Sequence, residues 1–345
     1  MSFPRDLRIG IPAVLGILLV VLRCVQVSQR TLYWDDLVIP AKFSPLSFTG
    51  LFGLYDNHLM PGSALVQVLV ARAAPLSWWL PALIIVLLTA ASFLLWVCAL
   101  RALAPDRPMM RLIGLALLGF SPFLMDAAGW WSTAINAYAW QCTCAGVLWL
   151  VLRGHPWFAA IVLLVGLVFT EKSLTIMPVI VVLLLIIGKI RSHKLSILLL
   201  VVVTAGWLVV YLPRLDFGLG GTTRTVTFGL PTALFQAIIP GAFGGPWQWS
   251  RWIPGKAFAD PNMALGIIAV IVLFALMFPA ALRRPQRVLL LIPTLGYLIT
   301  IWFFLFTARG GEETSETLLR SMHYYVDWWS MTVLVGVAGL RLHNT

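Results

Sequence analysis

The chain has 345 residues, of which 60% are hydrophobic and only 11% are charged, and it carries sixteen tryptophans. Its repeated apolar runs near twenty residues exclude a soluble globular protein and predict a polytopic membrane protein. The formal net charge is +11. We interpret this charge as a signal of membrane orientation, so a nucleic-acid partner is not expected.

We predict an all-α helical bundle of about ten transmembrane helices that forms a single domain over residues 1–345, because each helix needs about 20 apolar residues to cross a core about 30 Å thick. The first apolar run follows Arg5 and Arg8, but it is too long for a signal peptide and no small-residue cleavage site follows it. The predicted spans are 9–27, 80–100, 110–125, 131–152, 157–172, 173–190, 195–212, 263–282, 288–307 and 328–342.

The distribution of charge predicts the orientation of these spans. With the N-terminus in the cytoplasm, more than half of the 24 basic residues fall in short inner loops, which is the positive-inside pattern. Asp6 and Asp106 lie on that side, and the other acidic residues lie outside or at outer helix ends. We therefore expect a plasma (inner) membrane protein with both termini cytoplasmic.

Three outer loops are long enough to carry function. The loop over 28–79 contains an apolar stretch, 61–75, in which Gln67 and Arg72 predict a helix lying in the membrane interface. The loop over 213–262 offers a second short apolar helix followed by Trp247, Trp249 and Trp252, an aromatic cluster typical of the headgroup level. No separate soluble domain is expected.

Ionisable groups gather at the outer ends of the spans, where they are costly unless paired, hydrated or functional. If the helices form one bundle, these groups converge on one outer cavity. There a carboxylate could accept the proton of an acceptor hydroxyl, and cations could neutralise a departing phosphate. The groups are Asp35, Asp36, Asp56, His58, Asp126, Glu171, Lys172, Arg309, Glu312, Glu313, Glu316, Arg320, His323, Tyr324, Tyr325 and Asp327.

Four short segments carry a resemblance. They are YWDDLVIP (33–40) with DNHLMPGSALVQVLVARAAPLSWWLPAL (56–83), then SPFLMDAAGWWSTAINAYAWQ (121–141), VFTEKSLTIMP (168–178) and LLRSMHYYVDWW (318–329). In this order and on one face of the membrane, they resemble the GT-C superfamily of membrane glycosyltransferases, which includes protein mannosyltransferase-like enzymes and aminoarabinose transferases.

The resemblance implies an inverting glycosyltransferase of cell-envelope glycan biosynthesis. Such an enzyme moves a sugar from a polyprenyl-phosphate carrier to a glycan, lipid or protein acceptor on the non-cytoplasmic face. By position, Asp35 matches the base or acceptor-orienting acid, Asp36 its partner and Asp126 the second acid. Lys172 matches the residue near the carrier phosphate. The late phosphate or acceptor contacts match Arg320, His323 and Tyr324, and we add Asp56, His58 and Glu171 as candidate substrate-binding residues.

Two motifs depart from the family pattern. The turn reads Glu-Lys at 171–172 instead of Lys-Glu, which leaves open which side chain faces the cavity. The late element reads His-Tyr-Tyr at 323–325 instead of a clean Arg-Tyr, which leaves open which residue binds phosphate.

The cofactor is also open. Members of the family often use a divalent metal, and carboxylates with a His suit Mg or Mn, so Asp36 and Asp126 are candidate ligands, although no tight ligand spacing supports them. No nucleotide cofactor is expected, since the chain has neither a P-loop nor a dinucleotide-binding fingerprint.

Simpler roles and rival functions stay open at this point. Asp35 could cap a helix over 36–43, Asp126 could cap the fourth span, and Lys172 could reach the headgroups. Glu312, Glu313 and Glu316 suit a solvated loop face. The rival functions are a transporter or flippase for lipids or lipid-linked sugars, and a noncatalytic membrane partner of a glycan-assembly enzyme. Ionisable groups at one face, instead of at the midplane, favour the transferase.

Overall fold

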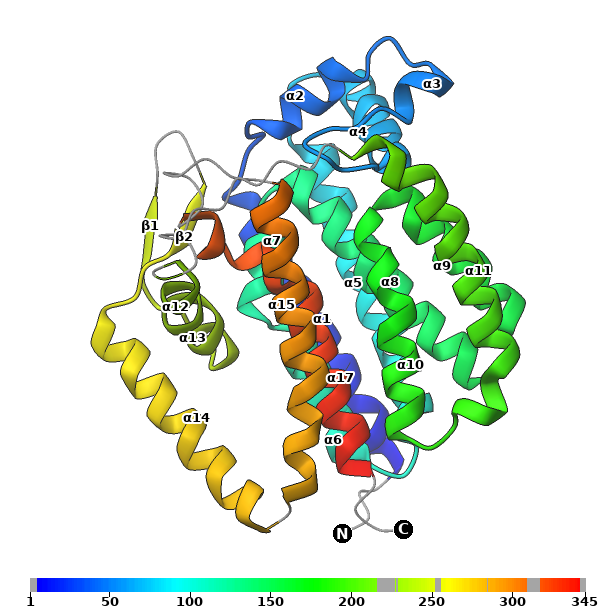
Figure 1. Cartoon of the computed structure of the whole chain (residues 1–345). Helices are drawn as coiled ribbons and strands as arrows, with labels where there is room; N and C mark the ends of the chain where they lie inside the picture. The colour runs from blue at the N-terminus through cyan, green and yellow to red at the C-terminus, as the bar shows by residue number, and fades with distance from the viewer. Residues whose placement is uncertain are drawn as a thin grey trace. The chain divides into compact units, whose positions relative to one another are not determined.

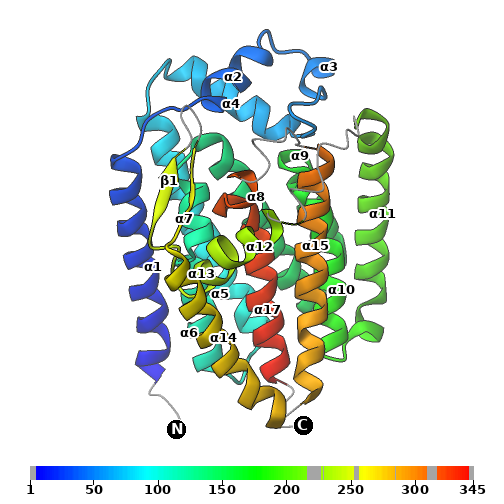
Figure 2. The ribbon, with the colours of Figure 1, turned by 60° about the vertical axis from the view of Figure 1, so that its left-hand side comes forward.

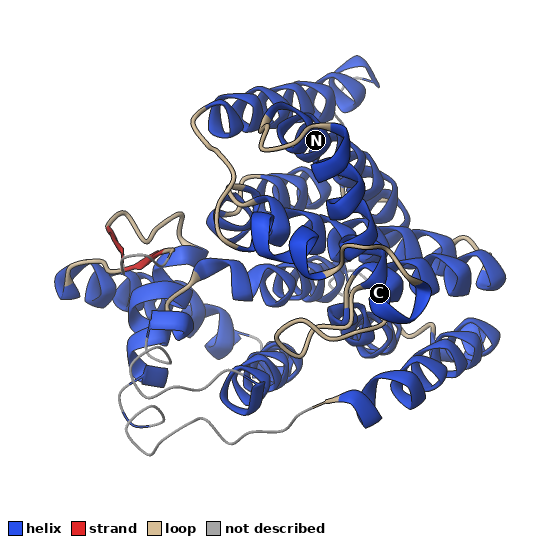
Figure 3. Cartoon of the chain, turned by 90° about the horizontal axis from the view of Figure 1, so that it is seen from above, coloured by secondary structure: helices blue, strands red, loops and turns tan. Residues whose placement is uncertain are grey.

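The computed structural model describes residues 5–215, 227, 229–251, 256–283, 285–308 and 317–341. In Figure 3 the regular secondary structure of this part of the chain is helical apart from two short strands. Its internal contacts divide the chain into two compact units. Unit 1 comprises Met1–Phe120, Ala128–Leu215 and Val337–Thr345, and unit 2 comprises Ser121–Ala127 and Asp216–Gly336.

Six helices within the described residues are long and apolar enough to cross a membrane. They are Gly10–Ser28, Trp79–Leu103, Pro108–Ala128, Trp131–Leu152, Ile190–Arg214 and Val288–Leu305. Shorter apolar helices cover Pro156–Phe169, Leu230–Ala242 and Ala264–Ala275. An all-α membrane protein is thus confirmed, whereas a count of about ten spans stays a prediction.

The predicted spans 157–172 and 173–190 do not have the expected lengths. The structure has α9 over Pro156–Phe169, a 3-10 helix η1 over Glu171–Thr175 and α10 over Ile176–Ile186. Thr170 between them is extended, with φ −158° and ψ 129°. The helix therefore stops before Glu171, a buried acid.

The predicted span 110–125 is likewise two helices, α6 over Pro108–Gly119 and α7 over Pro122–Ala128. Pro122 explains the break, because a proline has no N–H for the helical ladder and disfavours helical backbone in the residue before it. The break brings the start of α7, which carries Asp126, into unit 2.

The long helices of unit 1 pack in a chain of neighbours in which α1 contacts α5, α5 contacts α8, α8 contacts α9, and α9 contacts α11 (Figure 1). Their bounds are Arg5–Ser28, Trp79–Leu103, Trp131–Leu152, Pro156–Phe169 and Lys194–Tyr211, the last preceded by η2 over Ile190–His193 and followed by η3 over Leu212–Arg214. Small residues bring α8 and α9 close, since Gly146 faces Val162 and Gly166 faces Thr143. Close approach at small residues is the usual basis of helix packing in membranes.

Three short helices lie together across one end of these long helices in Figures 1 and 2: α2 over Asp35–Lys42, α3 over Phe48–Leu51 and α4 over Pro61–Ala73. The helix predicted over 61–75 is thereby confirmed as α4. A buried apolar core joins α2 to α4, and it consists of Ile39, Phe43, Tyr55, Met60, Ala64 and Val68. Gln67 of α4 is fully buried, whereas Arg72 in its last turn is exposed.

Unit 2 contains the second predicted loop helix as a continuous helical run of α12 (Leu230–Thr232), the π-helix η5 (Ala233–Ile238) and α13 (Ile239–Ala242). A hairpin follows that the sequence did not predict, with β1 (Trp249–Arg251) antiparallel to β2 (Ala257–Ala259) and Ser250 opposite Phe258. The remaining elements are α14 (Met263–Arg283), η6 (Pro285–Leu290), α15 (Leu291–Ala308), η7 (Met322–Tyr325) and the part of α17 (Val326–Arg341) that precedes Val337. Trp252, Arg309, Glu312, Glu313 and Glu316 lie outside the described residues.

We expect Gly166→Ala to weaken the packing of α8 on α9. A Cβ at Gly166 would lie 2.4 Å from both Thr143 Cγ2 and Thr143 Oγ1, and overpacking of this kind costs about 1–3 kcal/mol. Gly206→Ala in α11 is the matched control, because a Cβ there meets nothing within 4 Å. Thermal unfolding of both variants in detergent measures the difference. Equal midpoints would contradict the close α8–α9 contact.

Candidate functional site

Asp36 fastens the first loop of unit 1 to the beginning of α8. Its Oδ1 accepts hydrogen bonds from the Ser132 N–H at 2.8 Å and the Ser132 hydroxyl at 2.6 Å, and its Oδ2 accepts from the Tyr33 N–H at 2.9 Å. The first N–H groups of a helix have no intrahelical partner and favour negative charge. A buried carboxylate is therefore well placed at the start of α8.

Asp35 has a different environment. It is half-buried, and its Oδ1 accepts a hydrogen bond of 2.5 Å from the Tyr55 hydroxyl. The suggestion that Asp35 caps a helix is wrong, because Asp35 is the first residue of α2 and the N-cap position belongs to Trp34, which makes no side-chain cap. The two adjacent acids therefore differ both in burial and in what they bind.

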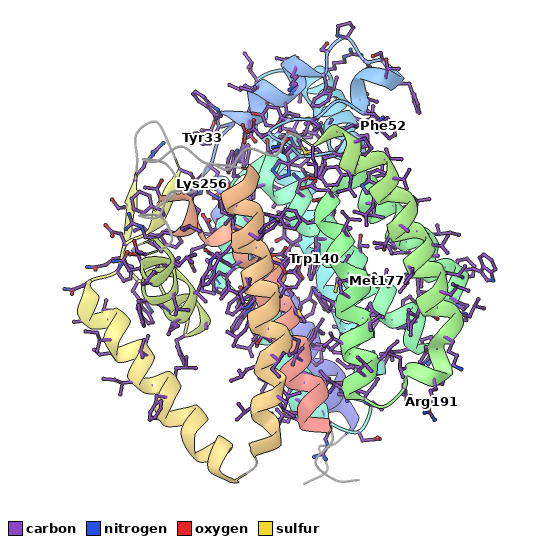
Figure 4. The ribbon with its side chains drawn as sticks, in the orientation of Figure 1. Tyr33, Phe52, Trp140, Met177, Arg191 and Lys256 are labelled. Atoms are coloured by element: carbon purple, nitrogen blue, oxygen red, sulfur yellow. The ribbon has the colours of Figure 1, made fainter. Side chains whose placement is uncertain are left out.

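The backbone before the acidic pair is held in an uncommon conformation. Trp34, whose side chain is exposed, has φ +37° and ψ −96°, a region that costs of order 1–3 kcal/mol for a residue with a side chain. The backbone of Tyr33, labelled in Figure 4, is held at two atoms. Its N–H donates to Asp36, and its carbonyl oxygen accepts from the Trp130 indole at 3.3 Å. These bonds impose the conformation.

Tyr55 and His58 flank a tight turn. The two residues exchange backbone hydrogen bonds of 3.1 and 2.8 Å, and the central residues Asp56 and Asn57 have φ +47° and +62°, as in a type I′ turn. Asp and Asn tolerate such backbone angles better than most residues. Asp56 is exposed at this turn, so its placement there is explained by backbone geometry, and its role in substrate binding stays a prediction.

His58 fastens the same turn to η1. Its Nδ1 lies 2.5 Å from Glu171 Oε1. Burial alone would raise the pKa of the Glu171 carboxyl, but the charge and hydrogen bond of His58, with a backbone hydrogen bond and Lys172, outweigh burial and lower that pKa. Of the two residues in the Glu-Lys turn, Glu171 is the buried one and Lys172 is half-buried.

A cavity of about 180 Å³ opens beside Asp36. Its walls are apolar except for Asp36, Gln67 and Ser77. Burial raises the pKa of Asp36 to about 6, in spite of the hydrogen bonds from Ser132 and Tyr33, which lower it. A carboxyl group with a pKa near neutrality beside a mostly apolar cavity is a candidate functional group.

The candidates in unit 2 form a second cluster around Asp126. Its Oδ1 lies 3.1 Å from Lys256 Nζ, and its Oδ2 accepts from the His323 N–H at 3.0 Å and lies 3.1 Å from His323 Nδ1. Lys256 Nζ is also 3.1 Å from that same Nδ1. Because Nδ1 donates when protonated and accepts when not, the proton position on His323 decides which neighbour it binds.

Arg320 and Tyr324 extend this cluster. Arg320 Nη1 donates to Asp260 Oδ1 at 2.8 Å and to Gln236 Oε1 at 3.1 Å, and the guanidinium lies 4.4 Å from the centre of the Phe258 ring. The Tyr324 ring packs 4.2 Å from the His323 ring, centre to centre. Of the predicted residues of the late motif, His323 therefore contacts Asp126 directly, whereas Arg320 and Tyr324 contact other residues of the cluster. The hairpin of unit 2 contributes Lys256.

Sequence reasoning missed several residues that bind the predicted site residues or the partners of those residues. In unit 1 these are Tyr55, Ser132 and Gln67; in unit 2 they are Lys256 and Asp260. A signal existed for Gln67, as a polar residue inside an apolar helix, and for Lys256, as the single lysine after residue 194. Nothing in the sequence marks Ser132 or Tyr55.

The donor groups do not form a ready metal site. Within the described ranges no three His, Cys, Asp or Glu side chains are close enough to hold a metal. Both oxygens of Asp36 already accept hydrogen bonds, and the charge of Asp126 faces Lys256. Asp36 and Asp126 also belong to different units. Dependence on Mg or Mn stays a prediction from the resemblance.

We expect the stability of the protein to depend on pH through Asp36. The folded state holds the proton of the Asp36 carboxyl group more tightly than the unfolded state, in which the pKa of this group is near 3.8. The free energy of unfolding therefore falls as pH rises from about 4 through about 6. Asp36→Asn removes this titration. Across pH 4–8 the wild type should lose up to about 3 kcal/mol relative to the variant. A constant difference in unfolding midpoint over that range would refute this.

In unit 2, Lys256→Met should destabilise the protein by about 2–3 kcal/mol, because it leaves the largely buried Asp126 carboxylate without its cation. The double variant Asp126→Asn with Lys256→Met should recover much of this loss. Lys189→Met is the control, since Lys189 is exposed. Additive losses in the double variant, measured by thermal unfolding, would show that the pair is not coupled.

Comparisons of this chain with protein-family models, with curated proteins and with solved structures found no match. Any assignment of activity therefore depends on the residues of the two clusters and on the motifs that suggested them.

Proposed function

We propose that this protein is an inverting glycosyltransferase that moves a sugar from a polyprenyl-phosphate carrier to an acceptor hydroxyl on the non-cytoplasmic face of the membrane. The observation that carries the proposal is the different environment of two adjacent acids, Asp35 half-buried beside Tyr55 and Asp36 buried beside a mostly apolar cavity. Two neighbouring carboxyl groups that lie in different surroundings can take different roles, and such pairs are typical of sites of acid–base chemistry.

Asp35 is the base in this mechanism. Its carboxylate accepts the proton of the acceptor hydroxyl while the hydroxyl oxygen forms a bond to the anomeric carbon of the sugar. The bond from that carbon to the carrier phosphate oxygen breaks, and the phosphate leaves with the electron pair. One displacement from the opposite face inverts the anomeric centre.

The surrounding residues hold this base in position. Tyr55 orients Asp35 by its hydrogen bond, and His58 keeps Tyr55 in place by binding Glu171 from the other end of the same turn. Asp36 holds the start of α2 against α8. Fixed geometry of this kind is a large part of catalysis, because reactants meet without further loss of freedom.

The departing phosphate requires positive charge. Lys172, which follows Glu171 in the same unit as Asp35, has the chemistry to supply it. In unit 2, Arg320 offers the planar guanidinium that matches phosphate oxygens. Lys256 and Arg320 are paired with Asp126 and Asp260, so phosphate binding by either one would exchange a carboxylate partner for a phosphate.

One observation favours a second candidate, a flippase for lipid-linked sugars. Arg23 is fully buried inside the candidate span Gly10–Ser28, and in the described part of the chain its Nε and Nη2 have no hydrogen-bond partner. Ionisable groups within spans often mark a substrate path. Arg23 lies five residues before the end of α1, about 7.5 Å along the axis, whereas transporters bind near the midplane. Translocation of a fluorescent polyprenyl phosphate across proteoliposomes would favour the flippase.

We expect Asp35→Asn to reduce sugar transfer by about a thousandfold, because it removes the general base. The assay supplies a panel of polyprenyl-phosphate hexoses and pentoses to the protein in proteoliposomes. Tyr55→Phe should reduce transfer less, by about tenfold, since the base stays but loses its orienting bond. The control is Asp106→Asn, an exposed acid outside both clusters.

Unchanged turnover in Asp35→Asn would remove the catalytic assignment of this residue. Unfolding midpoints of all three variants distinguish loss of chemistry from loss of fold.

A further inference from the structure

We propose that the cavity beside Asp36 is the acceptor subsite of the transferase, and that it takes a hydroxylated six-membered ring carried on an apolar chain. This inference rests on the proposed function, because it assigns the acceptor that the reaction requires. The occupant is therefore a glycolipid-like molecule.

Two polar side chains meet at one place in the cavity wall. Asp36 Oδ1 and Gln67 Oε1 both lie within hydrogen-bond distance of the Ser132 hydroxyl, at 2.6 and 3.0 Å. Gln67 is fully buried, and its amide Nε2 has no hydrogen-bond partner among the residues that the structure describes. Buried donors in proteins almost always have a partner, so an unpaired one in a cavity wall indicates a ligand group.

A hydroxyl group fits the chemistry of this pair. Its oxygen can accept from the Gln67 amide, and its proton can be donated to the Asp36 carboxyl group. Sugar rings carry neighbouring hydroxyls that satisfy both residues at once. An anion such as the carrier phosphate does not fit, since it would face the Asp36 carboxylate.

The remaining walls suit an apolar body. Trp131, only 2% exposed, gives the cavity an aromatic wall. At the exposed side the lining includes Leu37 and Leu76, which are 46% and 83% exposed. The lining also includes Pro81 at the start of α5, the candidate span Trp79–Leu103. An alkyl chain attached to the ring could leave over the two leucines and follow α5 into the membrane.

The size of the cavity limits the occupant. Its volume is about 180 Å³, and an engineered protein cavity of about 150 Å³ binds benzene. One six-membered ring is therefore the largest rigid group that fits. A disaccharide would leave its second ring outside.

The test measures binding, separately from transfer. Tritiated hexyl β-D-glucopyranoside is equilibrated with the protein in lipid nanodiscs, and empty nanodiscs give the background. 1-Hexanol, which has the chain and no ring, is the competitor that should fail. Gln67→Leu should weaken glucoside binding about tenfold, the effect of one buried hydrogen bond.

Two further variants guard against a misfolded Gln67→Leu protein. Ala71→Phe fills the cavity while keeping Gln67, and it should also weaken binding. Gln141→Leu is the matched control, because Gln141 of α8 is equally buried but accepts a hydrogen bond from the Trp96 indole N–H of α5 and does not line the cavity. It should bind the glucoside like the wild type.

Asp35→Asn separates the two proposals, because it should abolish transfer while saturable glucoside binding persists, since Asp35 is not one of the residues that line the cavity. Absence of saturable binding in the wild type, equal competition by 1-hexanol, or wild-type affinity in Gln67→Leu would each overturn the subsite. Normal glucoside binding without any transfer from polyprenyl-phosphate sugars would keep the cavity as a glycoside site and overturn its role as an acceptor subsite.

Discussion

The attachment of Asp36 to the first turn of α8 is the interaction on which the geometry of unit 1 depends. One carboxylate accepts from the backbone and hydroxyl of Ser132 and from the backbone of Tyr33. It thereby fixes the chain before α2 and α2 itself relative to a long helix. The uncommon backbone of Trp34 persists because the bonds on either side of it leave no alternative.

A second attachment, His58 to Glu171, fixes the same loop at another point. Tyr55 lies between the two attachments, since it pairs with His58 through the backbone and with Asp35 through its hydroxyl. Two anchors determine the position of Asp35 more tightly than either would alone. The end of α9 belongs to this arrangement, because Glu171 reaches His58 only after the helix has stopped at Phe169.

The sequence predicted what local pattern controls. Apolar runs predicted the long helices, the stretch over 61–75 predicted α4, and charge next to apolar runs singled out Asp35, Asp36 and Asp126. It could not predict which acid is buried, because the burial of Asp36 depends on Ser132, ninety-six positions away along the chain. The lengths of α9 and α10 failed for a similar reason, since an apolar run shows where a helix can form and not where a distant His58 requires it to end.

The different roles that we propose for Asp35 and Asp36 follow from what each position requires. At position 36 an asparagine could accept from Ser132 but would place its amide hydrogens against the Tyr33 N–H, so only a side chain that accepts on both sides fits. The hydrogen bonds around this position therefore explain an acid at 36, and burial raises its pKa to about 6. At position 35 a negative charge in the first turn of α2 is worth only about 0.3–1 kcal/mol through the helix dipole, and a neutral asparagine could also accept the hydrogen bond from Tyr55. The acid at 35 is better explained by chemistry than by stability, which is why we propose that Asp35 takes the proton and that Asp36 positions the substrate and the loop.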